Sequence, residues 1–369
     1  MSLPGQKMYV VTQPELVQKV QKQHKTLAFP PIEAKFASTV CGHSLEAQAI
    51  LAKNVNGDEG DFGLSMESYS AMRAALKPGS DLDDMNRSMI QKIAKALELL
   101  EPPRGDSRRV GMYAWLRDAI TTATTRSVYG PMNSYDDKAI ADAFWHQTTS
   151  VHDQVAKAFE AYYKAGGVQK ASALTQKRYQ AEIDNNVPLE DIARYEVGGS
   201  ITILNGSTVK TIDITTLKEA CPLLLSSYQE VLRYSSMGTS VREVMEDTYL
   251  DQWLLKQGAM LQMPSRIIHQ DAGLWGANVA DFNPRRLLPE EKQNRPRDLC
   301  FRAFGGGKTL YPGRHFATNE ILAVLAVFIA RLDMKPLQGD CRLPTTANTN
   351  VAAVVMEPDD DFQVAIKTR

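Results

Sequence analysis

The feature that most constrains this sequence is a glycine-rich stretch that runs directly into an apolar helix. Three glycines at 305–307 are followed by Pro312-Gly313, and the residues from His315 to Leu332 are mainly apolar. Glycine adopts backbone angles that other residues avoid, so we predict a tight loop with positive φ angles. Exposed amides at the start of a helix favour a flat or anionic ligand. The sequence therefore predicts a ligand-facing loop attached to a core helix.

Charge and length exclude several classes of protein. The 369 residues include 42 Lys and Arg against 43 Asp and Glu, and this balance argues against a nucleic-acid partner. The longest apolar run, Ile321–Ala330, is about half of the roughly 20 residues that a membrane-spanning helix needs. The four cysteines (41, 221, 300 and 341) are too far apart for a metal knuckle. We expect no membrane span, reduced thiols and a cytoplasmic location.

Hydrophobic spacing predicts a mainly α chain with small β-sheets. Leu82, Met89, Ile93 and Leu97 recur at helical intervals, and Pro102-Pro103 ends that run. A single domain over residues 1–369 is favoured over two domains. Predicted helices cover 14–20, 82–100, 112–123, 137–164, 189–204, 221–234 and 315–332; predicted strands cover 8–12 and 208–215, and a hairpin-like tail ends the chain.

Three further patterns could carry chemistry. Glu230 and Arg233 are three residues apart on one helix, a spacing typical of a surface ion pair. Pro284 and Arg286 lie in a coil before the glycine loop. His269-Gln-Asp271 is followed shortly by Trp275-Gly276. Within the glycine loop itself, Lys308 imitates the end of a phosphate-binding loop, but the helix begins several residues too late for one.

Together, in this order and spacing, these patterns resemble the C-terminal half of a cytochrome P450. The sequence around these motifs is similar to that of filamentous-fungal members distantly akin to the prostacyclin synthase and sterol 7α-hydroxylase branch. The resemblance implies a P450-like fold, a haem, a small apolar ligand and, where haem is retained, a reductase partner. It also implies the following roles: haem loop for Phe304, Gly307, Gly313 and Arg314; propionate contacts for Arg242, Trp115 and Arg117; a buried structural network for Glu230, Arg233 and Arg286.

The first departure from that family is at the axial-ligand position, which holds Tyr311 in place of cysteine. The cysteine thiolate binds the haem iron and drives cleavage of the O–O bond. A phenol, whose ordinary pKa is near 10, does not supply that push. Tyrosine does hold the iron in catalases, so Tyr311 is also a candidate metal ligand. We expect no thiolate-type oxygen activation.

The second and third departures are missing segments. Only 40 positions separate Leu189 from Glu230, several tens fewer than the family uses, so part of the central helix over the haem is absent. Met1 begins just before the first predicted strand, so the family's membrane anchor is absent as well. If the true gene product has an anchor, we expect it at the face of the endoplasmic reticulum.

Three functions remain open at this point. The leading interpretation is an inactive P450-like protein derived from a fungal secondary-metabolism monooxygenase with a terpenoid or sterol-like substrate. The first alternative is a haem-free cyclase or isomerase that reuses the apolar pocket. The second is a haemoprotein with a tyrosinate ligand. His146, His269 and His315 have no metal-spaced partners and are predicted to be structural, and Lys308 and Arg314 form a weak anion site.

Overall fold

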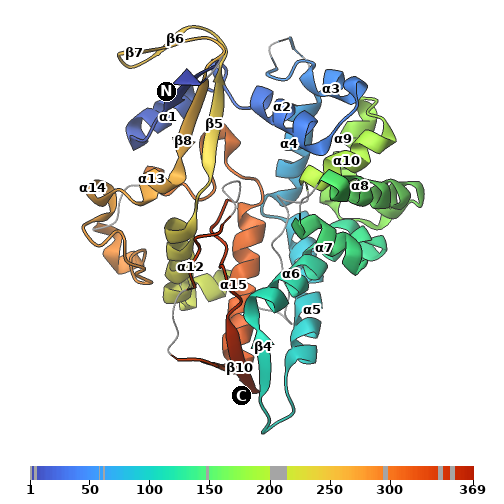
Figure 1. The fold of residues 1–369 in the computed structure, drawn as a ribbon, viewed down its shortest axis with the longest axis vertical. Helices are drawn as coiled ribbons and strands as arrows, with labels where there is room; N and C mark the ends of the chain where they lie inside the picture. The colour runs from blue at the N-terminus through green and yellow to red at the C-terminus, as the bar shows by residue number, and fades with distance from the viewer. Residues whose placement is uncertain are drawn as a thin grey trace. The chain divides into compact units, whose positions relative to one another are not determined.

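Helices dominate the described part of the chain, and small sheets accompany them (Figure 1). The computed structural model describes residues 2–3, 6–57, 59–60, 63–146, 149–199, 214–293, 298–339, 344–349 and 354–369. The prediction of a mainly α fold with small β-sheets is confirmed.

The chain divides into two compact units, each built from segments far apart in the sequence. The first unit comprises Met1–Ile32, Thr215–Tyr311 and Pro344–Asp360. The second comprises Glu33–Ile214, Pro312–Leu343 and Asp361–Arg369. Each unit has its own hydrophobic core, and the single domain stays a prediction.

A five-stranded sheet organises the first unit. Its strands follow the order β1-β2-β8-β5-β3, and β2 pairs with β8 in parallel although some 250 residues separate them in sequence. Val20, Leu27 and Leu261 lie fully buried in its core. Its strands are β1 (Ser2–Leu3), β2 (Gln6–Val10), β3 (Leu27–Ala28), β5 (Thr239–Val244) and β8 (Met260–Pro264), with a separate hairpin of β6 (Thr248–Leu250) and β7 (Trp253–Leu255).

Short helices complete the first unit. Pro14 and Pro222 occupy the first positions of two of them, where a missing backbone N–H is not needed. The helices are α1 (Pro14–Lys22), α11 (Ile214–Ala220), α12 (Pro222–Ser235), α13 (Ser265–His269) and α14 (Ala272–Trp275), with 3-10 turns η5 (Pro289–Gln293), η6 (Asp298–Cys300) and η7 (Gly307–Thr309).

The second unit is a helical assembly around a large core. Met89, Ile93 and Leu97 on α5 are fully buried, as their helical spacing predicts. Its helices are α2 (Pro30–Cys41), α3 (Leu45–Ala52), α4 (Leu64–Leu76), α5 (Ser80–Leu100), α6 (Met112–Tyr129), α7 (Lys138–His146), α8 (Thr149–Lys164), α9 (Ala173–Asp184), α10 (Leu189–Gly199) and α15 (Arg314–Arg331), with 3-10 turns η1 (Gly130–Met132), η2 (Ser134–Asp136) and η3 (Gly167–Lys170).

A three-stranded antiparallel sheet belongs to the same unit. Strand β10 (Gln363–Thr368) lies between β4 (Arg108–Gly111) and β9 (Leu332–Pro336). The pairing of β9 with β10 agrees with the predicted hairpin-like tail. Within the described ranges, no helix is both long and apolar enough to cross a membrane.

Several boundaries differ from the predictions. Helices α7 and α8 cover the predicted segment 137–164 on either side of residues 147 and 148, which lie outside the described residues. Helix α6 continues past Ala123 to Tyr129. The hydroxyls of Thr121 and Thr125 donate hydrogen bonds to backbone carbonyls one turn earlier, so these polar side chains are accommodated within the helix.

The region for which the sequence predicts a shortened central helix is described in part. Helix α10 confirms the predicted helix from Leu189 as far as Gly199, and the rest of that prediction, to Leu204, lies outside the described residues. Most of the predicted strand 208–215 also lies outside them. Its last two residues, Ile214 and Thr215, begin helix α11, so the strand prediction is wrong there.

Candidate functional site

The glycine loop of the first unit has the predicted backbone geometry. Gly305 and Gly307 adopt φ angles of +75° and +65°, a region that residues with a Cβ rarely enter. The Tyr311 amide donates to the Phe304 carbonyl at 3.0 Å and closes the loop. The prediction of a tight turn with positive φ angles is therefore confirmed.

An arginine that sequence reasoning missed supports this loop. Arg302 is buried, and both terminal nitrogens of its guanidinium donate to the side-chain oxygen of Gln21 at 2.6 Å. A Cβ on Gly306 would lie 2.3 Å from the Arg302 Nη1 atom, so a larger residue there would require the guanidinium to shift. Burial lowers the pKa of Arg302. Gly306 therefore contributes to this packing through its small size and not through its backbone angle.

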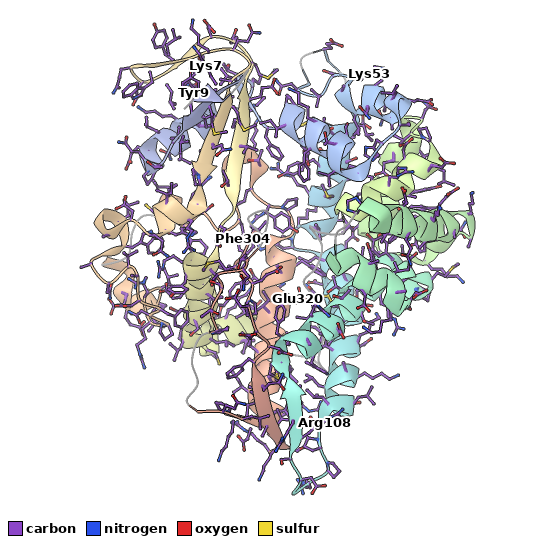
Figure 2. All side chains as sticks on the ribbon, viewed as in Figure 1. Lys7, Tyr9, Lys53, Arg108, Phe304 and Glu320 are labelled. Carbon is purple, nitrogen blue, oxygen red and sulfur yellow. The ribbon has the colours of Figure 1, made fainter. Side chains whose placement is uncertain are left out.

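Tyr311 lies at the position that the resemblance assigns to the axial cysteine, and that assignment stays a prediction. Its ring is half-buried and stacks on Phe304, with centroids 6.3 Å apart and planes 6° from parallel. Figure 2 labels Phe304 in this loop. The phenol oxygen stands at the far end of a ring, whereas a cysteine sulfur lies next to the backbone. The loop therefore presents an aromatic pair where the family presents a thiolate.

Arg242, on β5, also reaches the loop. It is buried and donates to the Thr309 hydroxyl at 2.6 Å and to the Val241 carbonyl at 2.5 Å. Its guanidinium lies 5.5 Å above the centroid of the Phe29 ring. Thr309 in turn donates to the Gly306 carbonyl at 3.2 Å, so Arg242 holds the loop through this hydroxyl.

The Glu230 carboxylate of the first unit is the centre of a buried ionic network. Arg233 donates to both of its oxygens at 2.8 Å in a bidentate pair, and Arg286 donates to one of them at 3.1 Å. Glu230 and Arg233 are completely buried. Such fork-like pairing is strong and directional. The geometry is thus that of an internal support and not of the surface pair that the spacing alone suggests.

Backbone carbonyls accept the remaining arginine protons. Arg233 donates to the His269 carbonyl at 2.8 Å, and Arg286 donates to those of Trp275, Asn278 and Asp281. Helix α12 is thereby joined to the coil that carries Pro284.

His269 is buried beside this network. Its Nε2 accepts a hydrogen bond from the Arg302 amide at 2.8 Å, and its ring stacks on Phe301. Burial, reinforced by the positive charge of Arg233, lowers the pKa of His269 to about 4. The imidazole is neutral at physiological pH and connects the network to the start of the glycine loop. His315 lies one residue into α15, and the side chain of His146 lies outside the described residues.

The other sequence-predicted residues lie in the second unit. Gly313 precedes α15 and accepts from the Ala317 amide at 2.9 Å, and Arg314 is the first residue of that helix. Trp115 packs edge-on against Phe328 at 5.4 Å. Arg117 forms an ion pair with Asp118 at 3.5 Å. The propionate roles that the resemblance gives to Trp115 and Arg117 stay predictions.

A second buried cluster, in the second unit, was not predicted at all. Arg178 donates to both oxygens of Glu196 at 3.0 and 3.3 Å, and both side chains are about 99% buried. The hydroxyls of Tyr129 and Tyr163 donate to the same carboxylate at 2.7 Å each. Only one signal in the sequence points to it: Arg178 and Glu182 are four residues apart on one helix, which ordinarily indicates a surface pair.

Two further buried acids in this unit are held in their neutral form. Burial raises the pKa of Glu182 to about 8, and Arg178 lowers it in part. Burial also raises the pKa of Glu320 well above its ordinary value, with the Thr124 hydroxyl opposing it in part. Figure 2 shows Glu320 on α15.

Comparisons with known proteins agree with the fold and with the motifs. The chain matches the cytochrome P450 fold: it is similar over its full length to retinoic-acid-bound cyanobacterial CYP120A1, covering 90% of that chain with a TM-score of 0.68 and 16% identity. The model of the cytochrome P450 family matches residues 203–364.

The relatives found by sequence include fungal and plant enzymes, and two fungal relatives align over nearly the whole chain. The cytochrome P450 monooxygenase nodJ of Hypoxylon pulicicidum is 28% identical over 434 aligned positions, which cover 100% of this chain and 82% of that protein. A cytochrome P450 monooxygenase of Gibberella zeae is 22% identical and covers 97% of this chain and 79% of its own. The chain is thus similar to cytochrome P450 proteins in fold and in sequence.

The P450 resemblance implies a haem, and the loop decides whether this chain can hold one in the usual way. The residues that frame the loop are suited to a large flat ligand, since Gly305 and Gly307 keep the backbone open and Arg242 is anchored beside them. The side-chain atom available to bind the haem iron is not suited, because Tyr311 offers a phenol oxygen and not a thiolate sulfur. Of the described cysteines, Cys300 is buried in the first core, and neither Cys41 nor Cys221 lies in the loop. The site does not fit a thiolate-ligated haem.

Proposed function

We propose that this protein is an inactive P450-like protein, derived from a fungal secondary-metabolism monooxygenase that acted on a terpenoid or sterol-like substrate. The single observation that carries the proposal is the phenol of Tyr311, stacked on Phe304, in a loop whose glycine geometry is otherwise that of a haem loop. The fungal monooxygenase origin is supported by the relatives, and the substrate class rests on the resemblance alone.

The chemical argument concerns electron donation. In this family the ligand trans to oxygen is a thiolate, which pushes electron density toward the O–O bond. A phenol has a higher ordinary pKa than a thiol and so ionises less readily near neutral pH. Within the first unit, Tyr311 uses its ring to pack against Phe304. Loss of the thiolate therefore removes the step on which oxygen insertion depends.

The short central helix supports the same proposal. The alignment with nodJ spans 434 positions, whereas this chain has 369 residues, so the relative has residues with no counterpart here. Gaps of this kind are what an internal deletion produces. We propose that the deletion lies between Gly199, the last described residue of α10, and Ile214, the first of α11.

The retained motifs have a structural reason to persist. Removal of Glu230 would leave two buried arginine charges unpaired, and removal of Arg233 would leave a buried carboxylate short of its main partner. Such losses destabilise the fold whether or not the protein is catalytic. We propose that Glu230, Arg233 and Arg286 are kept for this purpose.

A visible spectrum of the purified protein tests the proposal directly. Protein expressed with added haem precursor is reduced and exposed to carbon monoxide, and bound haem is measured after extraction. We expect no band of a thiolate-ligated carbon monoxide complex. A band of that type, accompanied by reductase-dependent hydroxylation of a terpenoid, would overturn the proposal.

The variant Tyr311→Cys separates the axial ligand from the missing helix. We expect it to gain no hydroxylase turnover, because the segment that covers the distal side of haem is still absent. Leu310→Cys is the matched control, since it adds a thiol one position away from the axial site. Turnover in Tyr311→Cys, but not in the control, would show that the ligand alone explains inactivity and that the short helix is tolerated.

A further inference from the structure

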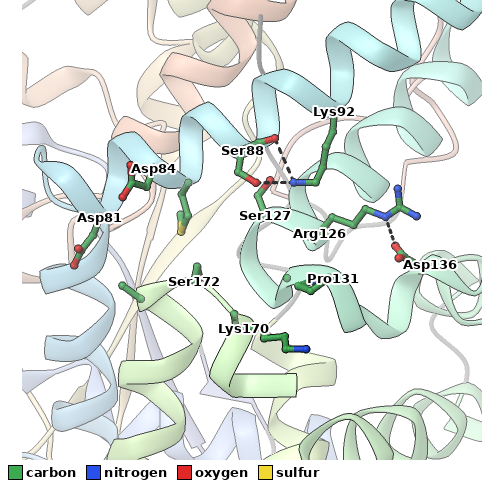
Figure 3. Close-up of a pocket in the computed structure, with 14 residues that line it drawn as sticks. Asp81, Asp84, Ser88, Lys92, Arg126, Ser127, Pro131, Asp136, Lys170 and Ser172 are labelled. Atoms are coloured by element: carbon green, nitrogen blue, oxygen red, sulfur yellow. Dashed lines mark hydrogen bonds and ion pairs between the residues drawn. The ribbon is translucent and has the colours of Figure 1, made fainter. Parts of the chain in front are cut away.

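A polar cleft in the second unit is independent of the glycine loop and of every motif read from the sequence. Its volume is about 650 Å³, within the range of small-molecule sites. It lies between α5, the end of α6, the turn η1, and the junction of η3 with α9 (Figure 3). All of its lining residues belong to the second unit.

The charges of this cleft are separated along its length. Figure 3 shows Asp81 and Asp84 at one end and Lys92 and Arg126 at the other. Both aspartates already have cationic partners, since Asp81 pairs with Lys177 at 2.6 Å and Asp84 pairs with Arg87 at 2.5 Å. The acidic end is therefore neutralised from outside the cleft, because neither Lys177 nor Arg87 lines it.

The basic end keeps unused positive charge. Lys92 donates to the Ser88 hydroxyl at 2.6 Å and to the Ser88 carbonyl at 3.3 Å, both of them neutral acceptors. Lys170, from η3, extends toward the same end (Figure 3). Among the described residues, neither lysine has a carboxylate within ion-pair distance. Half-burial and the nearby charge of Arg126 lower the pKa of Lys92, and Asp136 opposes them. A bound anion would therefore reduce the unfavourable positive potential at the Lys92 ammonium.

The Arg126 guanidinium, at the same basic end of the cleft, has N–H donors that could bind a ligand. Its Nε donates to Asp136 at 2.6 Å, and the same Asp136 oxygen also accepts from Asn133 at 2.8 Å. In the described part of the chain, the two terminal nitrogens of Arg126 have no hydrogen-bond partner. A guanidinium fork beside two ammonium groups matches the oxygens of a phosphate.

The wall opposite Lys92 is fixed by close backbone packing. Gly130 has a φ of +77°, and a Cβ there would lie 2.2 Å from the Lys170 carbonyl oxygen. Ser88 accepts from Lys92, so its own hydroxyl proton is available to a ligand. The cations are thus mounted on a preorganised frame, which lowers the entropy lost on binding.

We propose that this cleft binds a small phosphorylated molecule, with its phosphate group held by Lys92, Arg126 and Lys170. The phosphate occupies the basic end, and the remaining polar volume accommodates the organic part. A cation at the acidic end is disfavoured because Asp81 and Asp84 are already paired.

Calorimetric titration of the full chain with inorganic phosphate and with pyrophosphate tests this site. Sodium chloride at matched ionic strength provides the reference, since screening alone changes surface electrostatics. We expect saturable binding, and affinity about tenfold lower in Lys92→Gln and in Lys170→Gln, the loss typical of one charge-assisted hydrogen bond. Lys95→Gln is the matched control, an exposed lysine on α5 that does not line the cleft.

Two outcomes would overturn the proposal. The first is equal phosphate affinity in the wild type, both cleft variants and the control, since binding would then lie elsewhere. The second is heat no greater than that of chloride at the same ionic strength. Lys170 is exposed, so Lys170→Gln should fold normally and keeps the test valid if the half-buried Lys92 proves necessary for stability. Circular dichroism melts establish folding for each variant.

Discussion

Each unit of this protein contains a buried ionic cluster, and the two clusters have opposite charge balances. In the first unit, one carboxylate, Glu230, faces two arginines, and backbone carbonyls accept what remains. In the second unit, one arginine, Arg178, is close to two carboxylates, those of Glu196 and Glu182. The first cluster needs no protonated acid, whereas the charges of the second balance only while the Glu182 carboxyl group is protonated.

This difference teaches where each unit is sensitive. In the first cluster, neutral backbone carbonyls accept hydrogen bonds from the surplus arginine, because guanidinium groups never lose their charge near neutral pH. In the second cluster, the surplus carboxylate takes up a proton, because burial raises its pKa. The first cluster is therefore sensitive to substitution, and the second is sensitive to pH as well.

The largest effect is expected from Glu230→Ala. It leaves Arg233 and Arg286 buried without a counter-charge, and we expect a loss of about 3–5 kcal/mol in the free energy of unfolding. Urea denaturation followed by circular dichroism measures it. The control is Glu219→Ala, an exposed glutamate on the neighbouring α11, for which little change is expected. Equal losses in both variants would contradict a buried ionic role.

A smaller, pH-dependent effect is expected from Arg178→Met. This change keeps the length and removes the charge, so Glu196 and Glu182 lose their cation. We expect a loss of about 3 kcal/mol at pH 8 and a smaller loss at pH 5, where Glu182 holds a proton. Denaturation at the two pH values measures the difference, and Lys177→Met, an exposed neighbour, is the control. A loss independent of pH would refute the proposed balance.

The smallest effect is expected from Glu182→Gln. With a folded-state pKa of about 8 against 4.5 unfolded, the folded state binds more protons between these values. Stability is therefore full below about pH 4.5 and falls as pH rises toward 8. The amide cannot ionise, so we expect this slope to flatten, with a gain of about 1–2 kcal/mol at pH 8. Glu190→Gln, on α10, is the control, and an unchanged slope would exclude Glu182 as its source.

Sequence reasoning predicted those parts of the fold that a local pattern determines. The apolar periodicity of α5 and the glycines before α15 depend on neighbouring residues alone, and both agree with the structure. The threonine-rich end of α6 was missed, because hydroxyls that bond back to the helix are invisible to propensity. The partners of β2 could not be read either, since β8 lies far away in sequence.

The candidate site divides in the same way. Glu230, Arg233 and Arg286 were recognised through a family resemblance, while their spacing alone indicated a surface pair. Arg302 carries no such signal, because its partners, Gln21 and Gly306, are assembled only by folding. The Arg178 cluster brings together residues from four helices and was missed for the same reason.

The parallel pairing of β2 with β8 has a consequence for how the protein is made. Residues 6–10 leave the ribosome well before their partner strand, 260–264, which is translated some 250 residues later. Throughout that interval the nascent chain exposes an unpaired strand edge, while helices α2 to α10 can already pack on one another. A ribosome-associated chaperone that shields the leading segment should therefore raise the yield of correctly folded molecules more than one that acts after release.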